Sequence, residues 1–463
     1  MNLFVYGMMT CVCAGFLAGC AVGPDFHPPA ATLMAADIPG EWWGLFKSPE
    51  LDRLIRGALA DNPTLEAAQA ALRQAREDLN ARAGGEYVPE VNGSLSASRQ
   101  KTSSAAMGLP QGPASIFTLY HASVNVSYVF DVFGRGRREL EALRSLVDYQ
   151  AYQHEAARLA LTANIVTTVI MEASLREQVQ ATLQIMAIQQ KHLIMLRKQQ
   201  DLGGVSRAEF LSQRTEFEQT RALLPPLRRE LSQLRYHLTV LAGKMPVEAR
   251  RFPKFHLAML HLPLGLPSGL PASLTRQRPD LQAAEALLHA ASARVGVATA
   301  DLYPRITLNG SYGRSSAGSG NLFDANNAVW DLGAGLVQPL VNGGALRAKR
   351  RGAVAAMDEA SSRFRQTLLM AFEDVSNALR ALEEDGMAYQ ARVAAQSAAR
   401  DSLTLAREQF VSGAASYILL LNAERQYQQA CIALIQARST RLADAVALFQ
   451  SLGGGWWNRT KEK

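Results

Sequence analysis

Residues 123 to 202 decide the fold, and they begin with the segment Ser123-Val-Asn-Val-Ser-Tyr-Val-Phe-Asp131. Apolar side chains alternate there with mostly polar ones, which predicts a β-strand with one apolar face. After Phe133-Gly134-Arg135-Gly136 the apolar period lengthens to that of a helix, and neither proline nor glycine interrupts the chain from Arg137 to about Gln200. A helix of that extent would be roughly 95 Å long. This length exceeds one compact domain, so the pattern indicates a membrane-anchored stalk rather than a compact enzyme.

The same strand, turn and helix occur a second time. Leu332-Gly-Ala-Gly-Leu-Val-Gln-Pro-Leu340 alternates again, Asn342-Gly343-Gly344 forms the second break, and another long helical period runs from Leu346 to about Val411. Flanking motifs recur as well, since Tyr87-Val-Pro89 corresponds to Tyr303-Pro304. Because all these offsets are about 210 to 216 residues, the chain is predicted to be one duplicated unit.

The predicted fold is mainly helical, with four membrane strands and an internal duplication. The first repeat covers residues 41–260, with strands at about 89–99 and 120–131 and long helices at about 137–202 and 206–242. The second covers residues 261–452, with strands at about 304–314 and 330–340 and long helices at about 345–411 and 416–452. Residues 453–463 form a C-terminal tail. The segment from Gln100 to Phe117 is rich in Ser, Gly and Pro and is predicted to be a loop.

Strand number bears on how this chain could enter a membrane. No segment after the N-terminal leader offers the ~18 uninterrupted apolar residues of a spanning helix, whereas strands of about nine or ten residues can cross a bilayer when tilted. Four strands leave open edges whose backbone groups lipid cannot satisfy, so closure requires several copies of the chain. Because side chains nearly fill an eight-stranded barrel, a conducting pore points to three or more copies.

The N-terminus has the character of a bacterial export signal. Residues 1–19 contain no charged side chain and carry an apolar core, which predicts a signal peptide. Leu17-Ala18-Gly19-Cys20 resembles the lipobox of lipoproteins, which implies that Cys20 is lipidated and becomes the first mature residue. Ala21 stands where an aspartate would favour inner-membrane retention, so the resemblance implies the outer membrane. Residues 20–40 lack periodicity and predict an extended, lipidated tether.

The charge of the chain raises the question of a nucleic-acid partner. Net charge is +7 and the isoelectric point is near 9.3. The basic residues form no reading surface, however, and nucleic acid is not an expected partner. Two clusters each follow a strand: Arg135, Arg137 and Arg138, and Arg347, Lys349, Arg350 and Arg351. Positive charge opposes the dipole at a helix N-terminus, so either anionic lipid head groups or solvent must compensate it.

Catalytic and metal chemistry is not expected. The eight histidines show no ligand spacing with cysteine or carboxylate, and isolated histidines are more often structural. The sequence contains no catalytic constellation, no metal site and no cofactor motif. The lipid on Cys20 would be the one covalently attached group.

Several short motifs are specific in combination. They are Trp42-Trp43 with Phe46 and Leu51, Leu262-Pro-Leu-Gly-Leu-Pro-Ser268, Arg278-Pro-Asp280, Tyr303-Pro304, Gln338-Pro-Leu-Val-Asn-Gly-Gly344 and Leu452-Gly-Gly-Gly-Trp456. Together they resemble the TolC-type outer-membrane efflux channels, in the lipoprotein branch called NodT-like, from Cys20 to Trp456. The resemblance implies a homotrimer with a twelve-stranded outer-membrane β-barrel continued by a twelve-helix periplasmic tunnel. It also implies docking to a periplasmic adaptor and to an inner-membrane pump, usually of the resistance-nodulation-division class.

The helix pairs reverse direction at Gly203-Gly204-Val205-Ser206 and Gly413-Ala414-Ala415-Ser416. Glycine suits a helix C-terminus and serine can cap the next helix. By resemblance these turns are the tips that meet the adaptor, through Gly203, Gly204, Ser206, Gly413 and Ser416.

The helix after the second tip lines the periplasmic entrance by the same resemblance. Family members often carry acidic residues at positions that match Leu419 and Asn422, and this chain has neither carboxylate. Three copies of Leu419, Asn422 and Tyr417 are expected to close the mouth by packing and neutral hydrogen bonds. The alternative is that Leu419 and Leu421 pack the helix seam and Asn422 is merely solvated.

Three functions fit these patterns. The first is a passive conduit for drugs or other small molecules, the second a conduit for secreted proteins, and the third a periplasmic coiled-coil scaffold that conducts nothing. Four amphipathic strands favour a conduit, because a scaffold has no need of them. With this conduit, the resemblance to the TolC-type channels implies an outer-membrane channel of a tripartite efflux system.

Overall fold

The computed structural model describes residues 21–27, 38–102, 115–263 and 277–459. The chain divides into two compact units, and both repeats contribute to each of them. One unit comprises residues 1–29, 71–150 and 283–364, and the other comprises residues 30–70, 151–282 and 365–463. The predicted signal peptide, Cys20 and most of the tether lie outside the described residues.

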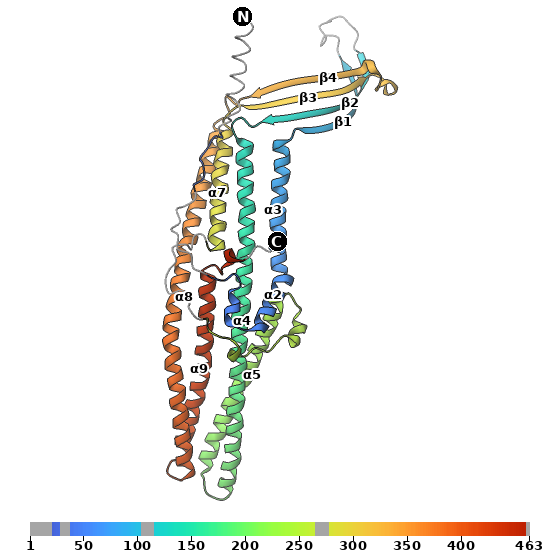
Figure 1. Cartoon of the computed structure of the whole chain (residues 1–463). Coiled ribbons are helices and arrows are strands. Elements are labelled where there is room, and N and C mark those ends of the chain that lie inside the picture. The colour runs from blue at the N-terminus through green and yellow to red at the C-terminus, as the bar shows by residue number, and fades with distance from the viewer. Residues whose placement is uncertain (1–20, 28–37, 103–114, 264–276, 460–463) are drawn as a thin grey trace. The chain divides into compact units, whose positions relative to one another are not determined.

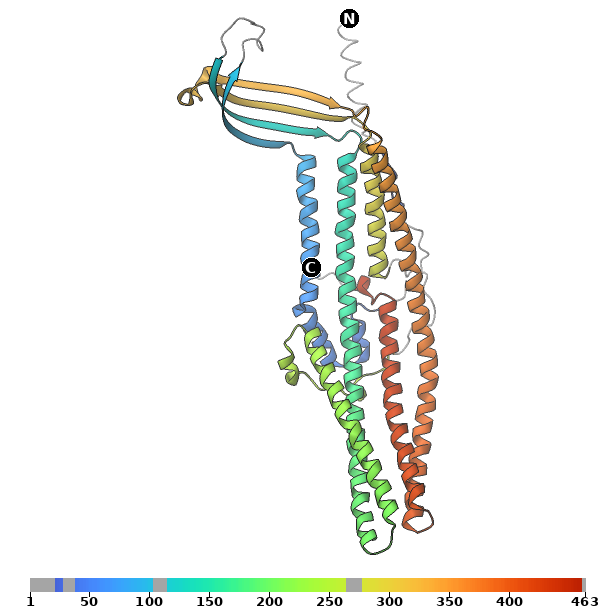
Figure 2. The same ribbon diagram turned by 180° about the vertical axis from the view of Figure 1, so that it is seen from behind.

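The first unit contains the β-sheet. Its strands are β1 (Glu90–Thr102), β2 (Ser115–Phe130), β3 (Arg305–Ser316) and β4 (Ala328–Val337), and all neighbours are antiparallel in the order β1-β2-β3-β4. Figure 1 labels the strands, and Figure 2 shows the same sheet from behind. The short 3-10 helices η5 (Ser319–Asn321) and η6 (Ala325–Asn327) lie between β3 and β4. The pairing of β2 with β3 joins the two repeats in one sheet.

The first hairpin extends further than its composition predicts. Gln100 pairs with Phe117 and Thr102 pairs with Ser115, although these residues fall in the segment predicted to be a loop. That prediction is wrong for residues 100–102 and 115–117, because each strand supplies hydrogen-bond partners to the other whatever the local composition.

In the first unit, two helices end just before a strand begins and two begin just after a strand ends. They are most of α3 (Pro63–Tyr87), the first part of α4 (Arg135–Asp201), most of α7 (Pro279–Ala300) and the first part of α8 (Ala345–Val411). Their buried contacts use mainly small residues, which allow close helix packing: Ala142, Ala286, Ala290, Ala293 and Val295, with the larger Leu140. Ion pairs add to this packing at the helix ends, including Arg82 Nη2 to Glu139 Oε2 at 2.6 Å.

The second unit holds the larger core. It contains α2 (Pro49–Asp61), the remainder of α4 and α8, α5 (Arg207–Leu241) and α9 (Tyr417–Ser451). Short 3-10 helices surround them: η1 (Trp42–Phe46), η3 (Pro246–Arg251), η4 (Leu257–Met259) and η7 (Trp456–Asn458). The ring of Trp42 stacks on that of Phe449 with centroids 5.3 Å apart. The motif Trp42-Trp43 therefore belongs to the buried core of this unit, together with Phe449.

The duplication is visible in the helix lengths. Helices α4 and α8 both have 67 residues, and α5 and α9 both have 35. The first residues of the two helix pairs differ by one constant offset, since 345 − 135 and 417 − 207 both equal 210. Length differences between the two repeats therefore lie in the strands and connections, and not in these four helices.

One stretch of α4 is long and apolar enough, by length and composition alone, to cross a membrane. Within the protein, 56% of that stretch is buried against other residues. It contributes Ile165, Val166, Val169 and Ile170 to the core of the second unit. The apolarity of this stretch is therefore explained by helix packing.

Candidate functional site

The four-stranded sheet has one apolar face that crosses all four strands. The pairing register aligns Val124 with Tyr312 and Tyr312 with Trp330, so side chains of the same character lie side by side. This face comprises Val91, Leu95, Val124, Val126, Tyr128, Phe130, Ile306, Leu308, Tyr312, Trp330, Leu332 and Leu336. Several members are largely exposed, among them Leu95 at 76% and Leu332 at 78%. Such a wide exposed apolar surface marks a contact with lipid or another partner.

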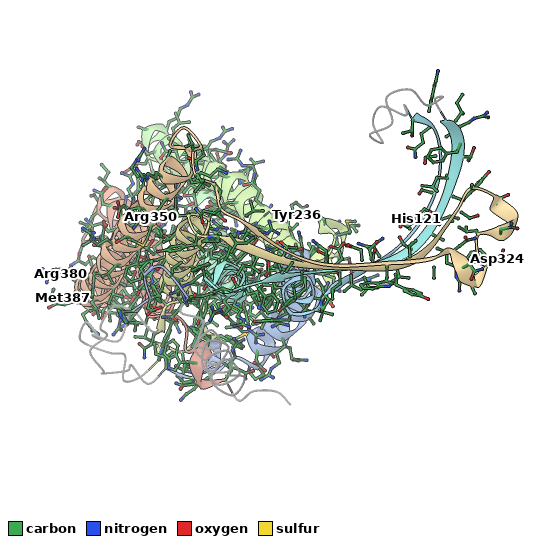
Figure 3. All side chains as sticks on the ribbon, turned by 90° about the horizontal axis from the view of Figure 1, so that it is seen from above. His121, Tyr236, Asp324, Arg350, Arg380 and Met387 are labelled. Carbon is green, nitrogen blue, oxygen red and sulfur yellow. The ribbon has the colours of Figure 1, made fainter. Side chains whose placement is uncertain are left out.

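The opposite face of the sheet is polar. Ser94 and Ser123 share a hydrogen bond of 2.8 Å between their Oγ atoms, and Asn125 Nδ2 donates to Ser94 Oγ at 3.1 Å. Ser127 Oγ donates to Asn309 Oδ1 at 2.9 Å, which links β2 to β3. These hydroxyls and amides form a mostly neutral, hydrogen-bonding surface. His121 on β2 and Asp324 after β3 lie toward the far end of the sheet (Figure 3).

The sheet has two open edges. Strand β1 pairs only with β2, and β4 pairs only with β3, within the described part of the chain. Backbone groups along the outer edges of β1 and β4 then need partners from outside the chain. Hydrocarbon offers no such partners, so in lipid these groups must be satisfied by protein.

Residues 21–27, directly after Cys20, are docked on the first unit. Val22 N donates to Phe133 O at 3.2 Å, and Asp25 Oδ1 lies 2.6 Å from Arg138 Nη2. The hydrogen bond from Arg138 lowers the pKa of Asp25. The ring of Phe26 stacks on that of His289 with centroids 4.3 Å apart. The predicted extended tether is thus held in place over these seven residues.

Sequence reasoning also missed how the first basic cluster is neutralised. Arg135 Nε lies 2.8 Å from Asp301 Oδ1, and Arg138 also pairs with Glu141 at 2.8 Å. Burial lowers the pKa of both side chains, but the hydrogen bond to Asp301 for Arg135, and those to Asp25 and Glu141 for Arg138, outweigh it, so that each pKa is raised. No local pattern reveals the pairs with Asp301 and Asp25, because both aspartates are far away in sequence.

The two helix turns predicted as tips share one backbone geometry. Gly203 and Gly413 adopt positive φ angles of 76° and 75°. Gly204 N donates to Gln199 O and Ala414 N donates to Gln409 O, each at 2.8 Å. These bonds close both helices with the same glycine-dependent motif.

The caps after the two turns differ. Ser206 forms a capping box with Glu209: Glu209 N donates to Ser206 Oγ at 3.2 Å, and Ser206 N donates to Glu209 Oε2 at 2.8 Å. Ser416 makes no side-chain cap, and Leu419 occupies the position that corresponds to Glu209. Helix α9 therefore begins without the polar cap of α5.

The three residues predicted for the entrance occupy different environments. Tyr417 is buried, donates a hydrogen bond to Gln213 Oε1 and lies edge-on to Phe410. Burial first, and then the carboxylates of Glu424, Glu216 and Glu209, raise the pKa of Tyr417. Leu419 is 47% exposed and Asn422 is exposed as well. Only Leu419 and Asn422 thus present their side chains on the surface of the chain.

Polar contacts in which one partner is a buried carboxylate join α9 to its neighbours near the tips. Arg425 Nη2 pairs with Glu216 Oε2 of α5 at 2.7 Å. Glu424 Oε1 lies 3.0 Å from His192 Nδ1 of α4 and 3.7 Å from Arg407 Nη2 of α8, without a well-aligned hydrogen bond among the described residues. The sequence carries no signal for these contacts, because Gln213, Glu216 and Thr220 on α5 become buried only when the helices pack.

These features coincide with one known family. The sequence model of the outer membrane efflux protein family matches residues 54–244 and 270–454, one match in each repeat. The chain is an outer membrane efflux protein. It is 32% identical over 444 residues to the pyoverdine export outer membrane protein OpmQ of Pseudomonas putida, covering 95% of this chain and 93% of OpmQ. It is 28% identical over 467 residues to the toluene efflux pump outer membrane protein TtgC of the same species, covering 97% and 95%.

Solved structures agree with this assignment. The outer-membrane channel OprN superposes with a TM-score of 0.88 at 28% identity, covering 94% of this chain and 100% of OprN. The open state of the MtrE channel of Neisseria gonorrhoeae gives 0.83 at 25% identity, covering 94% and 99%. This outer membrane efflux protein therefore has the TolC-like fold, with a membrane sheet and a periplasmic helical extension. It serves as the outer-membrane channel of an efflux pump and is not an enzyme.

Proposed function

We propose that this outer membrane efflux protein is a passive homotrimeric conduit that exports small molecules. The two-faced sheet with two open edges carries the proposal. Three copies supply twelve strands, and joining β4 of one chain to β1 of the next keeps every pair antiparallel. The apolar face then meets lipid and the hydroxyl and amide face lines the pore. Native mass spectrometry of the membrane-extracted protein tests this, and a stable monomer as the native state would contradict it.

The cargo class is proposed from the relatives. Those relatives are described as exporting pyoverdine, toluene, solvents or antibiotics, all of which are small compounds. Deletion of the gene should raise cellular accumulation of the compounds that the partner pump exports, and complementation should restore export. Unchanged accumulation of every pump substrate, in a strain without a substituting channel, would contradict the efflux role; impaired release of a protein would favour the secretion alternative.

Partners follow from the position of the helix turns. The residues Gly203, Gly204, Ser206, Gly413 and Ser416 are proposed to contact a periplasmic adaptor, which connects the channel to an inner-membrane pump of the resistance-nodulation-division class. Each turn carries one largely exposed apolar side chain, Leu202 and Val411, both 86% exposed. Exposed apolar residues at a polar helix turn favour a protein contact.

The lipid anchor is proposed at Cys20. In support, Ala21 lies against Gly134 in the turn between β2 and α4, so a mature chain that starts at Cys20 would begin beside this turn. Acyl chains on Cys20 then enter the bilayer next to the sheet. Mass spectrometry of the mature N-terminus should find acylated Cys20, and an unmodified N-terminus elsewhere would refute the assignment. Cys20→Ser should reduce maturation more than it reduces channel function, because the sheet also holds the protein in the membrane.

A further inference from the structure

The second basic cluster, Arg347, Lys349, Arg350 and Arg351, lies at the start of α8. All four side chains are exposed, and Figure 3 labels Arg350. Arg350 Nε donates to the neutral Thr299 Oγ1 at 3.2 Å, and within the described residues none of the four forms an ion pair. Helix α8 has no acidic residue in its first turn, and its first carboxylates are Asp358 and Glu359. Asp358 lies about 16 Å along the helix from Arg347.

The duplicated fold provides an internal comparison. The corresponding cluster at the start of α4 is matched by carboxylates on every arginine: Asp301 and Glu139 on Arg135, Asp131 on Arg137, and Asp25 and Glu141 on Arg138. The same fold position therefore carries a neutralised cluster in one repeat and an uncompensated one in the other. Within the described residues the second cluster is therefore open to an anion from outside the chain in place of solvent.

Two local effects make the uncompensated charge unfavourable. Positive side chains in the first turns oppose the partial positive charge of a helix N-terminus. Arg347 and Arg351 are also four residues apart, so two like charges face each other on one side of the helix. A phosphate group seated between them would relieve both effects at once.

The neighbouring sequence indicates where that anion comes from. Strand β4 ends with the exposed apolar residues Leu336 and Val337, and Leu340 and Val341 follow at 89% and 93% exposure. Helix α8 begins four residues later, and Arg351 lies about 9 Å along its axis. The head-group layer is about 5–7 Å thick on each side of the hydrocarbon, and long basic side chains extend to reach it.

We propose that Arg347 and Arg351, which share one side of α8, bind the head group of an anionic phospholipid in the periplasmic leaflet of the outer membrane, while Lys349, on another side of the helix, adds positive charge at the same depth. Arg350 is tied to Thr299 and holds the helix start against α7. The inference rests on the membrane location of β4, and not on the cargo, the gate or the partners proposed above. It makes the start of α8 a lipid-selective contact that the start of α4 does not share.

Native mass spectrometry of the full-length, detergent-extracted protein tests the proposal. The probes are phosphatidylglycerol and phosphatidylcholine with identical acyl chains. Wild type should retain phosphatidylglycerol preferentially, and rising salt should weaken this retention. The variant R347Q/K349Q/R351Q should lose the preference, with affinity falling about fivefold for each charge removed.

Two control variants separate charge from folding. R214Q/R228Q/R229Q removes three exposed arginines of α5 and the same net charge, and it should keep the wild-type preference. R347K/K349R/R351K retains the charge at each position and should also behave as wild type.

Three results would overturn the proposal: equal retention of both lipids by wild type, an unchanged preference in R347Q/K349Q/R351Q, or dissociation of that variant's oligomer without a change in lipid retention. The last would assign the arginines to carboxylates of a neighbouring chain. Conductance of the same wild-type sample reports channel formation separately, so failed lipid selectivity in a conducting channel removes this inference alone.

Discussion

At the residue scale, one carboxyl pair joins α8 and α9 away from the sheet, the helix turns and the entrance residues. Asp444 of α9 lies next to Asp385 of α8. One carboxylate oxygen of Asp444 is buried and has no hydrogen bond among the described residues. Burial first, and then the charge of Asp385, raise the pKa of Asp444 to about 7. The folded chain therefore favours the protonated carboxyl of Asp444.

This pair predicts an unusual pH dependence of stability. Because the pKa of Asp444 is raised by folding, the stabilisation is present at acid pH and is lost as the pH rises from about 4 to about 7. Asp444→Asn should therefore raise the melting temperature at pH 8 and leave it nearly unchanged at pH 4. The free energy of unfolding of the variant is expected to be higher by about 1 kcal/mol at pH 8 after allowing for solvent screening. Asp401→Asn, an exposed site on α8, serves as the control; parallel pH curves for the two variants would contradict the prediction.

A second residue-scale prediction concerns the docked segment after Cys20. Gly134 has a φ of 78°, and a Cβ atom there would lie 2.6 Å from Ala21 Cα. Gly134→Ala should therefore displace residues 21–27 and lower the free energy of unfolding by about 1–3 kcal/mol. Limited proteolysis near the N-terminus and thermal unfolding measure both effects. Gly84→Ala is the matched control, because Gly84 is helical with open space around it. This substitution should raise the free energy of unfolding by up to about 1 kcal/mol.

At the element scale, the duplicated helix starts can be compared directly. Ser206 caps α5 through the capping box with Glu209, whereas Ser416 leaves α9 without a side-chain cap. Ser206→Ala should lower local stability by about 1 kcal/mol and speed amide exchange in the first turn of α5. Ser416→Ala should change exchange in α9 much less. Hydrogen exchange with mass spectrometry compares the two turns in one sample, and equal effects would show that the caps are equivalent.

The first turns of α9 carry the prediction for the entrance. Leu419 and Asn422 are exposed on the chain, whereas Tyr417 is packed inside and bonded to Gln213. Leu419→Ala/Asn422→Ala trimers should therefore show a larger single-channel conductance with little change in its salt dependence, because no carboxylate is removed. Planar-bilayer recordings measure this. A conductance equal to that of wild type would remove both residues from the gate.

At the scale of the whole molecule, the periodicity of apolar residues predicted the helices and strands, whereas the charged residue types did not predict their contacts. The offset near 210 residues and the two breaks at Gly203 and Gly413 were sufficient to find the duplicated helices, because long uninterrupted periods and glycine ends are local signals. The apolar alternation at Val124 to Phe130 likewise identified the membrane strands. The whole TolC-like architecture followed from these patterns together with short family motifs.

Contacts between distant residues could not be predicted in the same way. Asp25 meets Arg138, Glu216 meets Arg425 and Glu424 meets His192 only after the helices are packed. Each pair combines common surface residue types, and nothing in the local pattern separates them from solvated charges. The hairpin ends at Thr102 and Ser115 were missed for a related reason, since cross-strand pairing overrides an unfavourable local composition.

The serine and asparagine face of the sheet has a kinetic consequence. Hydroxyl and amide groups exchange hydrogen bonds with water and with solutes at similar energies, so a passing molecule gains little by stopping at the wall. A duct lined this way has no saturable site of its own. The rate of export should then depend hyperbolically on cargo concentration, with a half-saturation concentration that is set by the pump. Exchanging Ser94, Ser123 or Asn125 for one another should leave this half-saturation concentration unchanged.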